Sequence, residues 1–279
     1  MAKYNSNWNE KKIAKYLKEG RGQNRGKDYI PWIQVQDFPS RGRVSRVKGW
    51  KTERVHHFLS DLELSYFYLL EWSDFVIDVR EQFPLKREET YAISKDKEIK
   101  HSTNDENDTP MVMTTDFLIN RLENGKDVTY ARTVKPSKEL EDNRTIEKLE
   151  IERQYWEDYG IEWGIITEKE IPIEIVKNIK WIHSSYYIDE SINPEGLRRL
   201  MEELKLLLRI KERTVIEVLD FFGQEYNLER GTSLSYLHHL IARKEVIIDM
   251  NMPFRVTSSI KDSILTIKQY EERDKIALY

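Results

Sequence analysis

The sequence predicts an α/β fold in which a mixed central sheet flanked by helices precedes a smaller helical domain. Segments up to about residue 170 follow in the order helix, three strands, helix, strand. Beyond that point the chain is mainly helical, and all seven tryptophans lie before Ile182. At about 150 residues per domain, a chain of 279 residues suggests two domains. We expect them at residues 1–169 and 170–279.

The first elements are two helices with a short strand between them. Residues 9–17 have helical spacing of apolar side chains, and "IQVQDF" at 33–38 alternates as a strand does. The second helix, residues 60–72, has Ser60 as a candidate N-cap. Glu63 follows three residues later, which is the capping-box arrangement.

The sheet is predicted from strand-like segments on both sides of a helix. Before that helix come residues 75–83, 111–120 and 128–134, with a polar connection at 94–109 between the first two. A helix at 144–159 and a last strand at 161–167 follow. This order indicates a sheet with helices packed against it.

The second domain is predicted as three helices followed by a hairpin. The helices cover residues 193–210, 214–226 and 232–244, and the strands are "EVIIDM" at 245–250 and "PFRVTS" at 253–258. This order is typical of a winged-helix domain, although many small domains share it.

Composition excludes several classes of site. The chain has no cysteine, so disulfides, thiolate zinc sites and a cysteine nucleophile are excluded. Its six histidines show no HExxH spacing, so we expect any metal to be held by oxygen atoms. No run of about 18 apolar residues and no apolar signal-peptide region is present, which predicts a cytoplasmic protein without a membrane segment.

Charge is distributed unevenly along the chain. Residues 1–60 hold 14 Lys and Arg against 5 Asp and Glu, a net charge of +9, which leaves −13 for the remainder. This segment also carries the aromatic residues Trp32 and Trp50, and its mixture of Lys, Arg and Gly offers no helix or ribbon suited to a DNA groove. We predict a basic arm that contacts DNA phosphates, with a solubilising loop as the alternative. The residues expected to make these contacts are Arg41, Arg43, Arg46 and Lys48.

Three charged residues suggest a catalytic site when taken together. Asp116 interrupts the apolar segment "MVMTTDFLI", Glu63 lies in the first turn of a helix, and Lys135 ends a strand before Pro136. Each alone has an ordinary explanation, such as a helix cap or a solvated strand end. Their order is that of the PD-(D/E)xK nuclease core. Two carboxylates suit Mg²⁺ or Mn²⁺, and a lysine can stabilise developing negative charge on a phosphate.

Longer segments carry a resemblance to a family. "EGRGQ", "GKDYIPW", "RVHHFLSDLEL", "IDVREQFPL", "MTTDFL", "VKP" and "RTIEKLEIERQYW" occur in this order. The chain therefore resembles the TnsA endonuclease, the subunit of heteromeric cut-and-paste transposases that cuts the 5′ ends of the element. The similarity covers most of residues 1–182 and is faint beyond them.

The resemblance implies site residues, a cofactor and a fold. Glu63, Asp116 and Lys135 match the family's catalytic positions, and the backbone carbonyl of Val134 is a further implied ligand of Mg²⁺, for which Mn²⁺ can substitute. Thr133 stands where the family usually has Gln, which puts its role as a ligand in doubt. The implied fold is a restriction-endonuclease-like first domain and a winged-helix-like second domain.

The resemblance also implies a reaction and partners. The reaction is hydrolysis of double-stranded DNA at transposon ends, giving a 5′-phosphate and a 3′-hydroxyl. The partners are a DDE-type transposase (TnsB-like) and an AAA+ ATPase regulator (TnsC-like). A stand-alone restriction-type nuclease and a non-cleaving assembly factor are the alternatives.

The second domain is predicted to dock the regulator rather than to read DNA. Its third helix offers only two basic residues, Arg243 and Lys244, and both come at its end. Helices that read DNA present such groups near their beginning. Aromatic residues that could anchor a protein interface, or fill the core instead, are Phe221, Phe222 and Tyr226.

Overall fold

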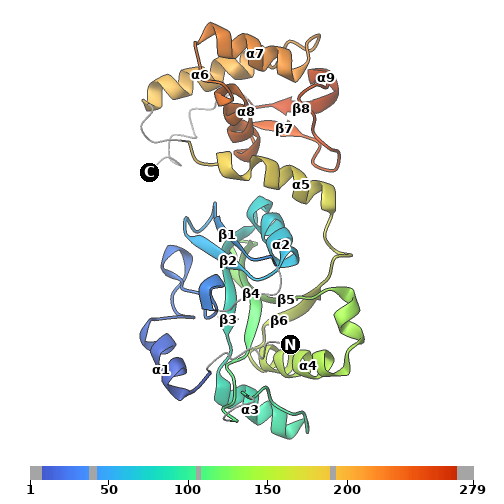
Figure 1. The fold of residues 1–279 in the computed structure, drawn as a ribbon. Helices are drawn as coiled ribbons and strands as arrows, with labels where there is room; N and C mark the ends of the chain where they lie inside the picture. Colours follow the sequence, from blue (N-terminus) through green and yellow to red (C-terminus); the bar gives the residue numbers. More distant parts are fainter. Residues whose placement is uncertain (1–7, 38–42, 105–107, 189–192, 269–279) are drawn as a thin grey trace. The chain divides into compact units, whose positions relative to one another are not determined.

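The structure is a computed structural model that describes residues 8–37, 43–104, 108–188 and 193–268. The chain forms two compact units, Met1–Ile171 and Pro172–Tyr279 (Figure 1). Each unit has its own core, and each is described separately below.

The first unit is built on a mixed sheet of strand order β3-β4-β5-β6 (Figure 1). These strands are Val76–Pro84, Thr114–Glu123, Lys126–Val134 and Glu162–Ile166. The pairs β3–β4 and β4–β5 are antiparallel, and β5–β6 is parallel. Asn124 and Gly125 connect β4 to β5 with φ of 50° and 75°, the left-handed backbone that a tight hairpin turn requires. The predicted mixed sheet is confirmed.

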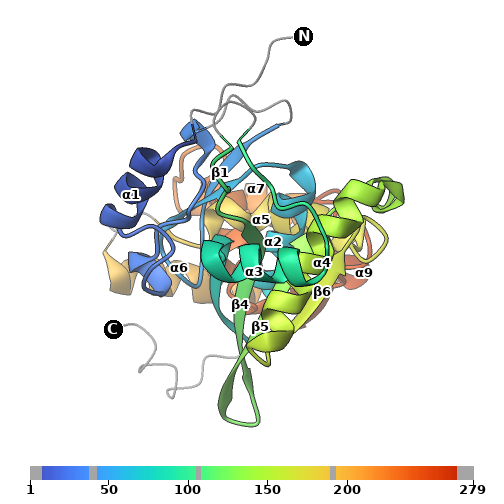
Figure 2. The same cartoon turned by 90° about the horizontal axis from the view of Figure 1, so that it is seen from below.

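Helices pack on both faces of this sheet. On one face Leu118 and Ala131 lie against Ile151 of α4 (Asn143–Asp158), which runs along β5 and β6 (Figure 2). On the other face Phe117 contacts Tyr66 of α2 (Asp61–Trp72), with ring centroids 5.4 Å apart. Neighbouring residues of β4 thus belong to different cores, which holds the strand between two layers of helix.

The chain between β3 and β4 contains a helix that the sequence did not predict, and most of it precedes the polar stretch at 94–109. Helix α3 covers Arg87–Asp96, and its Ile93 is buried in the cluster formed with α4. The helix has a weak apolar face, so it depends on this packing more than on its own pattern. A short 3-10 turn at Ser137–Glu141 lies between β5 and α4.

The described parts of the N-terminal segment are folded, and they contain a two-stranded ribbon that was not predicted from the sequence. The segment contains α1 (Glu10–Lys18), a 3-10 turn at Gly26–Asp28, and an antiparallel hairpin of β1 (Ser45–Lys48) and β2 (Val55–Phe58). Trp32 is 1% exposed and Trp50 7% exposed. Both tryptophans are therefore core residues, and their aromatic surface is not available to DNA.

The predicted strand at 33–38 was also wrong. Its described part contains a 3-10 turn at Val35–Asp37. The Asp37 carboxylate accepts from the Gln34 N–H at 2.8 Å and pairs with Arg21. A side chain that bonds the backbone three residues earlier favours a turn over an extended strand.

Close packing of this segment on β3 requires a glycine. Gly22 has φ of 75°, and a Cβ atom there would lie 2.1 Å from Cγ of Pro84. A side chain at residue 22 would push the segment away from the sheet.

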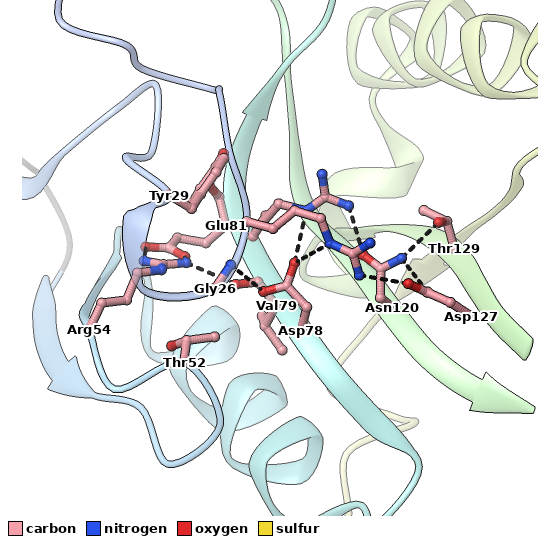
Figure 3. A network of polar contacts seen from close by, with 12 residues as sticks. Gly26, Tyr29, Thr52, Arg54, Asp78, Val79, Glu81, Asn120, Asp127 and Thr129 are labelled. Carbon is pink, nitrogen blue, oxygen red and sulfur yellow. Dashed lines mark hydrogen bonds and ion pairs between the residues drawn. The ribbon is translucent and has the colours of Figure 1, made fainter. Parts of the chain in front are cut away.

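A polar network joins the N-terminal segment to β3, an edge strand of the sheet (Figure 3). Arg54 donates to both carboxylate oxygens of Glu81 and, at 2.8 Å, to the carbonyl of Val79. Further along the strand, Asp78 accepts from the Gly26 N–H at 3.1 Å. These bonds satisfy polar groups on a sheet edge that would otherwise be open to pairing with another strand.

The second unit contains the three predicted helices, as α6 (Pro194–Leu207), α7 (Val215–Glu225) and α8 (Thr232–Ala242). Helix α5 (Ile173–Ile182), a 3-10 turn at His183–Ser185 and the short helix α9 (Ile260–Ser263) were not predicted. The winged-helix assignment of this unit stays a prediction.

The second strand of the C-terminal hairpin was placed wrongly. Strand β7 (Val246–Ile248) pairs with β8 (Ile264–Ile267), and residues 253–258 form no strand. The carbonyls of Val256 and Ser258 instead accept from backbone N–H groups in the first turn of α7. The N–H groups in the first turn of a helix have no acceptor within the helix, and these two carbonyls supply one.

In the described parts of the chain, no helix is long and apolar enough to cross a membrane.

Candidate active site

The predicted site residues lie in the first unit, where the start of α2 meets β4 and the end of β5. Glu63 is in the first turn of α2 and is 7% exposed. Ser60 caps the helix as predicted, since its hydroxyl accepts from the Glu63 N–H at 3.1 Å. The Glu63 carboxylate accepts from Ser60 Oγ at 2.9 Å and from the Leu59 N–H at 3.1 Å. The local sequence thus fixes where this carboxylate lies.

Asp116 lies on β4 and links the other predicted residues. It is 7% exposed, and its Oδ2 accepts from the Val134 N–H at 2.8 Å. The same oxygen lies 3.2 Å from Nζ of Lys135. Antiparallel pairing of β4 with β5 brings these residues together, although 18 or 19 positions separate them in the chain. The contact from Val134 is made by its N–H, and the carbonyl's role as a metal ligand stays a prediction.

A glutamine connects the two carboxylates. Gln82 on β3 has its amide nitrogen 3.4 Å from Oε2 of Glu63 and 3.4 Å from Oδ1 of Asp116. One side chain thus reaches both acidic groups, so they face a common space. Glu63, Asp116 and Lys135 are brought together as the sequence predicted.

Thr133 points at a fourth charged residue that the sequence analysis did not single out. Its hydroxyl donates to Oε1 of Glu152, a buried residue of α4. The same oxygen accepts from Thr115 Oγ1 at 2.7 Å and from Trp163 Nε1 at 3.1 Å. The structure therefore has the Thr133 hydroxyl bonded to a carboxylate, while its role as a ligand stays a prediction.

The site holds more negative charge than its surroundings compensate. Burial, followed by the charge of Asp116, raises the pKa of Glu63 to about 7 and that of Glu152 to about 7. The charge of Asp116 is also the main reason that the pKa of Lys135 is raised above its usual value. A cation placed beside Asp116 would relieve this repulsion.

The donor set fits a hard divalent cation, but with few protein ligands. Across the described ranges, no group of three or more His, Cys, Asp or Glu side chains is arranged to hold a metal ion. The available donors are the carboxylates of Glu63 and Asp116 and backbone oxygen. Mg²⁺ is commonly bound by one or two carboxylates with water and phosphate oxygens, so this set is sufficient for it.

The predicted DNA-binding residues lie on the hairpin that leads into α2. Arg43, Arg46 and Lys48 are exposed, and Arg43 Nε lies 4.0 Å from Oδ1 of Asp61 at the start of α2. Arg41 lies outside the described residues. A two-stranded ribbon is present here, contrary to the sequence analysis, and such ribbons do enter the major groove of DNA. The basic surface is therefore next to the helix turn that carries Glu63.

Comparison with known proteins identifies the family. A family model described as "TnsA-like endonuclease N terminal" matches residues 73–168, and one described as "TnsA endonuclease C terminal" matches residues 170–250. The Transposon Tn7 transposition protein TnsA of Escherichia coli is 41% identical over 277 residues, covering 99% of this chain and 100% of that protein. The chain belongs to the TnsA endonuclease family. The resemblance seen in the sequence is confirmed, and it also covers residues 170–250 of the second unit.

Two polar residues of this TnsA-family site were missed in the sequence. Glu152 lies among apolar residues on the buried side of α4, so a charged residue in that stripe was a signal that could have been noticed. Gln82 gave no such signal, because a glutamine in a strand is common. The pairing of β3 with β4 places Gln82 beside Asp116, and no local pattern predicts this contact.

The raised pKa of Glu152 leads to a test of site electrostatics in this TnsA-family protein. Because Glu152 keeps its proton to about pH 7 in the fold but loses it near its ordinary value when unfolded, its contribution to stability falls as pH rises between those values. Without metal, the free energy of unfolding of Glu152→Gln should therefore rise by up to about 3 kcal/mol relative to that of the wild type as the pH increases from 4.5 to 8. Urea unfolding with a chelator, at several pH values, measures this difference. Glu157→Gln, on the exposed side of α4, is the control. A difference that does not vary with pH would contradict the prediction.

Proposed function

We propose that this chain is a metal-dependent endonuclease that cuts DNA at the 5′ ends of a transposon. The reaction is hydrolysis of a phosphodiester, in which water attacks and the 3′ oxygen leaves, giving a 5′-phosphate and a 3′-hydroxyl. The observation that carries the proposal is the meeting of Glu63 and Asp116 at one amide, with Lys135 Nζ 3.2 Å from Asp116. Membership of the TnsA family supports DNA at a transposon end as the substrate.

Each residue of the site has a proposed role. Glu63, Asp116 and the carbonyl of Val134 would hold Mg²⁺, or Mn²⁺ in its place. When bound, the cation supplies a Lewis acid for the phosphate and lowers the pKa of its water. Lys135 would stabilise negative charge developing on the phosphate, since its raised pKa keeps it protonated at neutral pH. Burial of Glu63 and Asp116 limits their solvation and strengthens these interactions.

We propose that the protein works with a DDE-type transposase (TnsB-like) and an AAA+ ATPase regulator (TnsC-like). The Escherichia coli relative is named as a transposition protein, which supports a role in an assembly of this kind. A cleavage assay on duplex DNA carrying the transposon end, with Mg²⁺ or chelator and with or without both partners, tests the proposal. Cleavage at the 5′ ends that needs Mg²⁺ is the expected result. Equal cutting of any DNA without partners would indicate a stand-alone nuclease, and no cutting with partners would indicate an assembly factor.

The basic hairpin is predicted to bind DNA through its phosphates. Arg43→Glu with Arg46→Glu should weaken binding to all DNA sequences and reduce the slope of log affinity against log salt by about 2. Gel-shift titrations at several salt concentrations, on transposon-end and unrelated DNA, measure both effects. Lys11→Glu with Lys18→Glu, two exposed residues of α1, is the matched control. A loss confined to transposon-end DNA would contradict phosphate contact and favour base reading by the ribbon.

The second unit is proposed to dock the ATPase regulator. Helix α8 is its core helix, with Tyr236, Leu237 and Leu240 buried, so its beginning offers little to a DNA groove. Phe222 is fully buried and belongs to the core, whereas Phe221 is 42% exposed and Tyr226 38% exposed. Exposed aromatic side chains are frequent anchors of protein interfaces.

Substitution of the two exposed aromatics tests this docking in the full chain. Phe221→Ser with Tyr226→Ser should lower affinity for the regulator about tenfold or more and leave DNA affinity unchanged. Leu265→Ser, at an apolar residue of β8 that is 64% exposed, is the control for general surface effects. Surface plasmon resonance measures the affinity of each variant for the regulator and for DNA. Unchanged regulator affinity together with weaker DNA binding would reverse the assignment.

A further inference from the structure

We propose that the side-chain amide of Gln82 occupies the place of the catalytic cation and competes with it. In the metal-free protein this amide would keep the Glu63 and Asp116 carboxylates in the orientation that binds metal, and a divalent ion would displace it. The inference rests on the proposed function, because it takes these two carboxylates as the ligands of the ion. It adds to that function a residue that sets the strength of metal binding.

The contacts of Gln82 define this role. Its Nε2 lies 3.4 Å from an oxygen of each carboxylate, and its Oε1 accepts from Thr114 Oγ1 at 3.3 Å. An amide nitrogen has two hydrogens, and ionised carboxylates can only accept, so the nitrogen must face them. Gln82 is 2% exposed, and bulk water cannot easily replace it. The amide therefore donates one hydrogen towards each acidic group.

Charge explains why such a residue is needed. Two carboxylates that are both 7% exposed and that lie within reach of one amide repel each other, because burial limits their solvation. The positive end of the amide dipole offsets part of this repulsion. Both hydrogen bonds are near the upper limit of length, so each is weak. A divalent ion offsets the same charge more completely and can displace the amide.

The backbone holds Gln82 at this point. Its φ is 49°, a left-handed conformation that a glycine would adopt with less strain. The Trp32 N–H donates to the Gln82 carbonyl at 3.2 Å, which ties this position to the N-terminal segment. The conformation alone does not require glutamine, so the amide is what this residue contributes.

The test compares Mn²⁺ binding by the wild type with binding by Gln82→Met, which keeps the side-chain length and lacks the donors. Because the competitor is removed, Mn²⁺ affinity measured by calorimetry should rise about three- to tenfold. With a chelator, the melting temperature of the variant should fall by about 2–4 °C. Saturating Mn²⁺ should remove this difference in melting temperature between the variant and the wild type. A residue that merely braces the carboxylates would produce weaker metal binding on substitution instead.

A second variant and a control keep the test decisive. Gln82→Glu retains the acceptor for Thr114 and adds a carboxylate, so it should also bind Mn²⁺ more tightly and melt lower without metal. Gln154→Met, on the outer side of α4, should change neither value. Unchanged or weaker Mn²⁺ binding by both Gln82 variants, with normal binding by the wild type, overturns this inference alone. A wild type that binds no Mn²⁺ overturns the proposed function and this inference together.

Discussion

Replacing Asp116 with alanine is expected to abolish 5′-end cleavage and Mn²⁺ binding while leaving the protein folded. Asp116 reaches Lys135, the Val134 N–H and the amide of Gln82, so each proposed part of the site meets at this carboxylate. Loss of a proposed metal ligand that also pairs with the lysine should lower the cleavage rate by more than about a thousandfold. Cleavage of transposon-end DNA and calorimetric titration with Mn²⁺ measure the two losses.

The fold is expected to tolerate this change because two effects oppose each other. The buried Val134 N–H loses its acceptor, which costs about 1–3 kcal/mol. Burial and, after it, the charge of Asp116 raise the pKa of Glu63 and of Glu152, and the second of these causes disappears. The melting curve of Asp116→Ala should therefore stay cooperative and close to that of the wild type.

Two controls sharpen the Asp116 test. Glu123→Ala removes a carboxylate at the far end of the same strand and should cleave normally. Asp116→Asn keeps the shape and an acceptor for Val134, and it should lose metal binding all the same. Unchanged Mn²⁺ affinity in both Asp116 variants would remove this residue from the metal site.

Replacing Glu81 with leucine is expected to cause the largest loss of stability, about 3–5 kcal/mol. Glu81 is fully buried and accepts from Arg54, from His56 Nδ1 at 2.8 Å and from the His57 N–H at 3.0 Å. The substitution leaves the guanidinium of Arg54 buried without its carboxylate. Urea unfolding followed by circular dichroism at pH 7 measures the change.

The pH dependence of this network has a definite sign. Burial opposes the charge of Glu81, but His56 and Arg54 outweigh it and hold the pKa of Glu81 well below its usual value. Its contribution to stability is therefore complete above the ordinary pKa of a glutamate and is lost as pH falls below it. The gap in stability between the wild type and Glu81→Leu should narrow in acid.

Two further variants test whether the cost of Glu81→Leu comes from leaving a charge buried without its partner. The double variant Arg54→Met with Glu81→Leu should recover much of the loss, since an apolar pair can replace a buried ion pair. Glu162→Gln breaks the more exposed pair with Arg132 and should cost less than about 1 kcal/mol. A cost for Glu81→Leu as small as that of Glu162→Gln would show that the buried network contributes little.

The sequence by itself determined the features that depend on neighbours along the chain. The order of strands and helices predicted the mixed sheet, and the spacing of Ser60 and Glu63 predicted the cap of α2. Glu63, Asp116 and Lys135 were named from their types, their order and the family resemblance. Such features can be predicted because periodicity, caps and turns act over a few residues.

Only the tertiary structure decided the features that depend on distant contacts. Residues 33–38 read as a strand, yet Asp37 pairs with Arg21, 16 residues earlier, and Val35–Asp37 form a 3-10 turn. Residues 253–258 read as a strand, yet their carbonyls satisfy the start of α7. Gln82 and Glu152 joined the site only when β3, β4 and α4 were packed together. The physical reason is the same in each case: buried polar groups take the partner that the fold brings near, and the local pattern does not contain that partner.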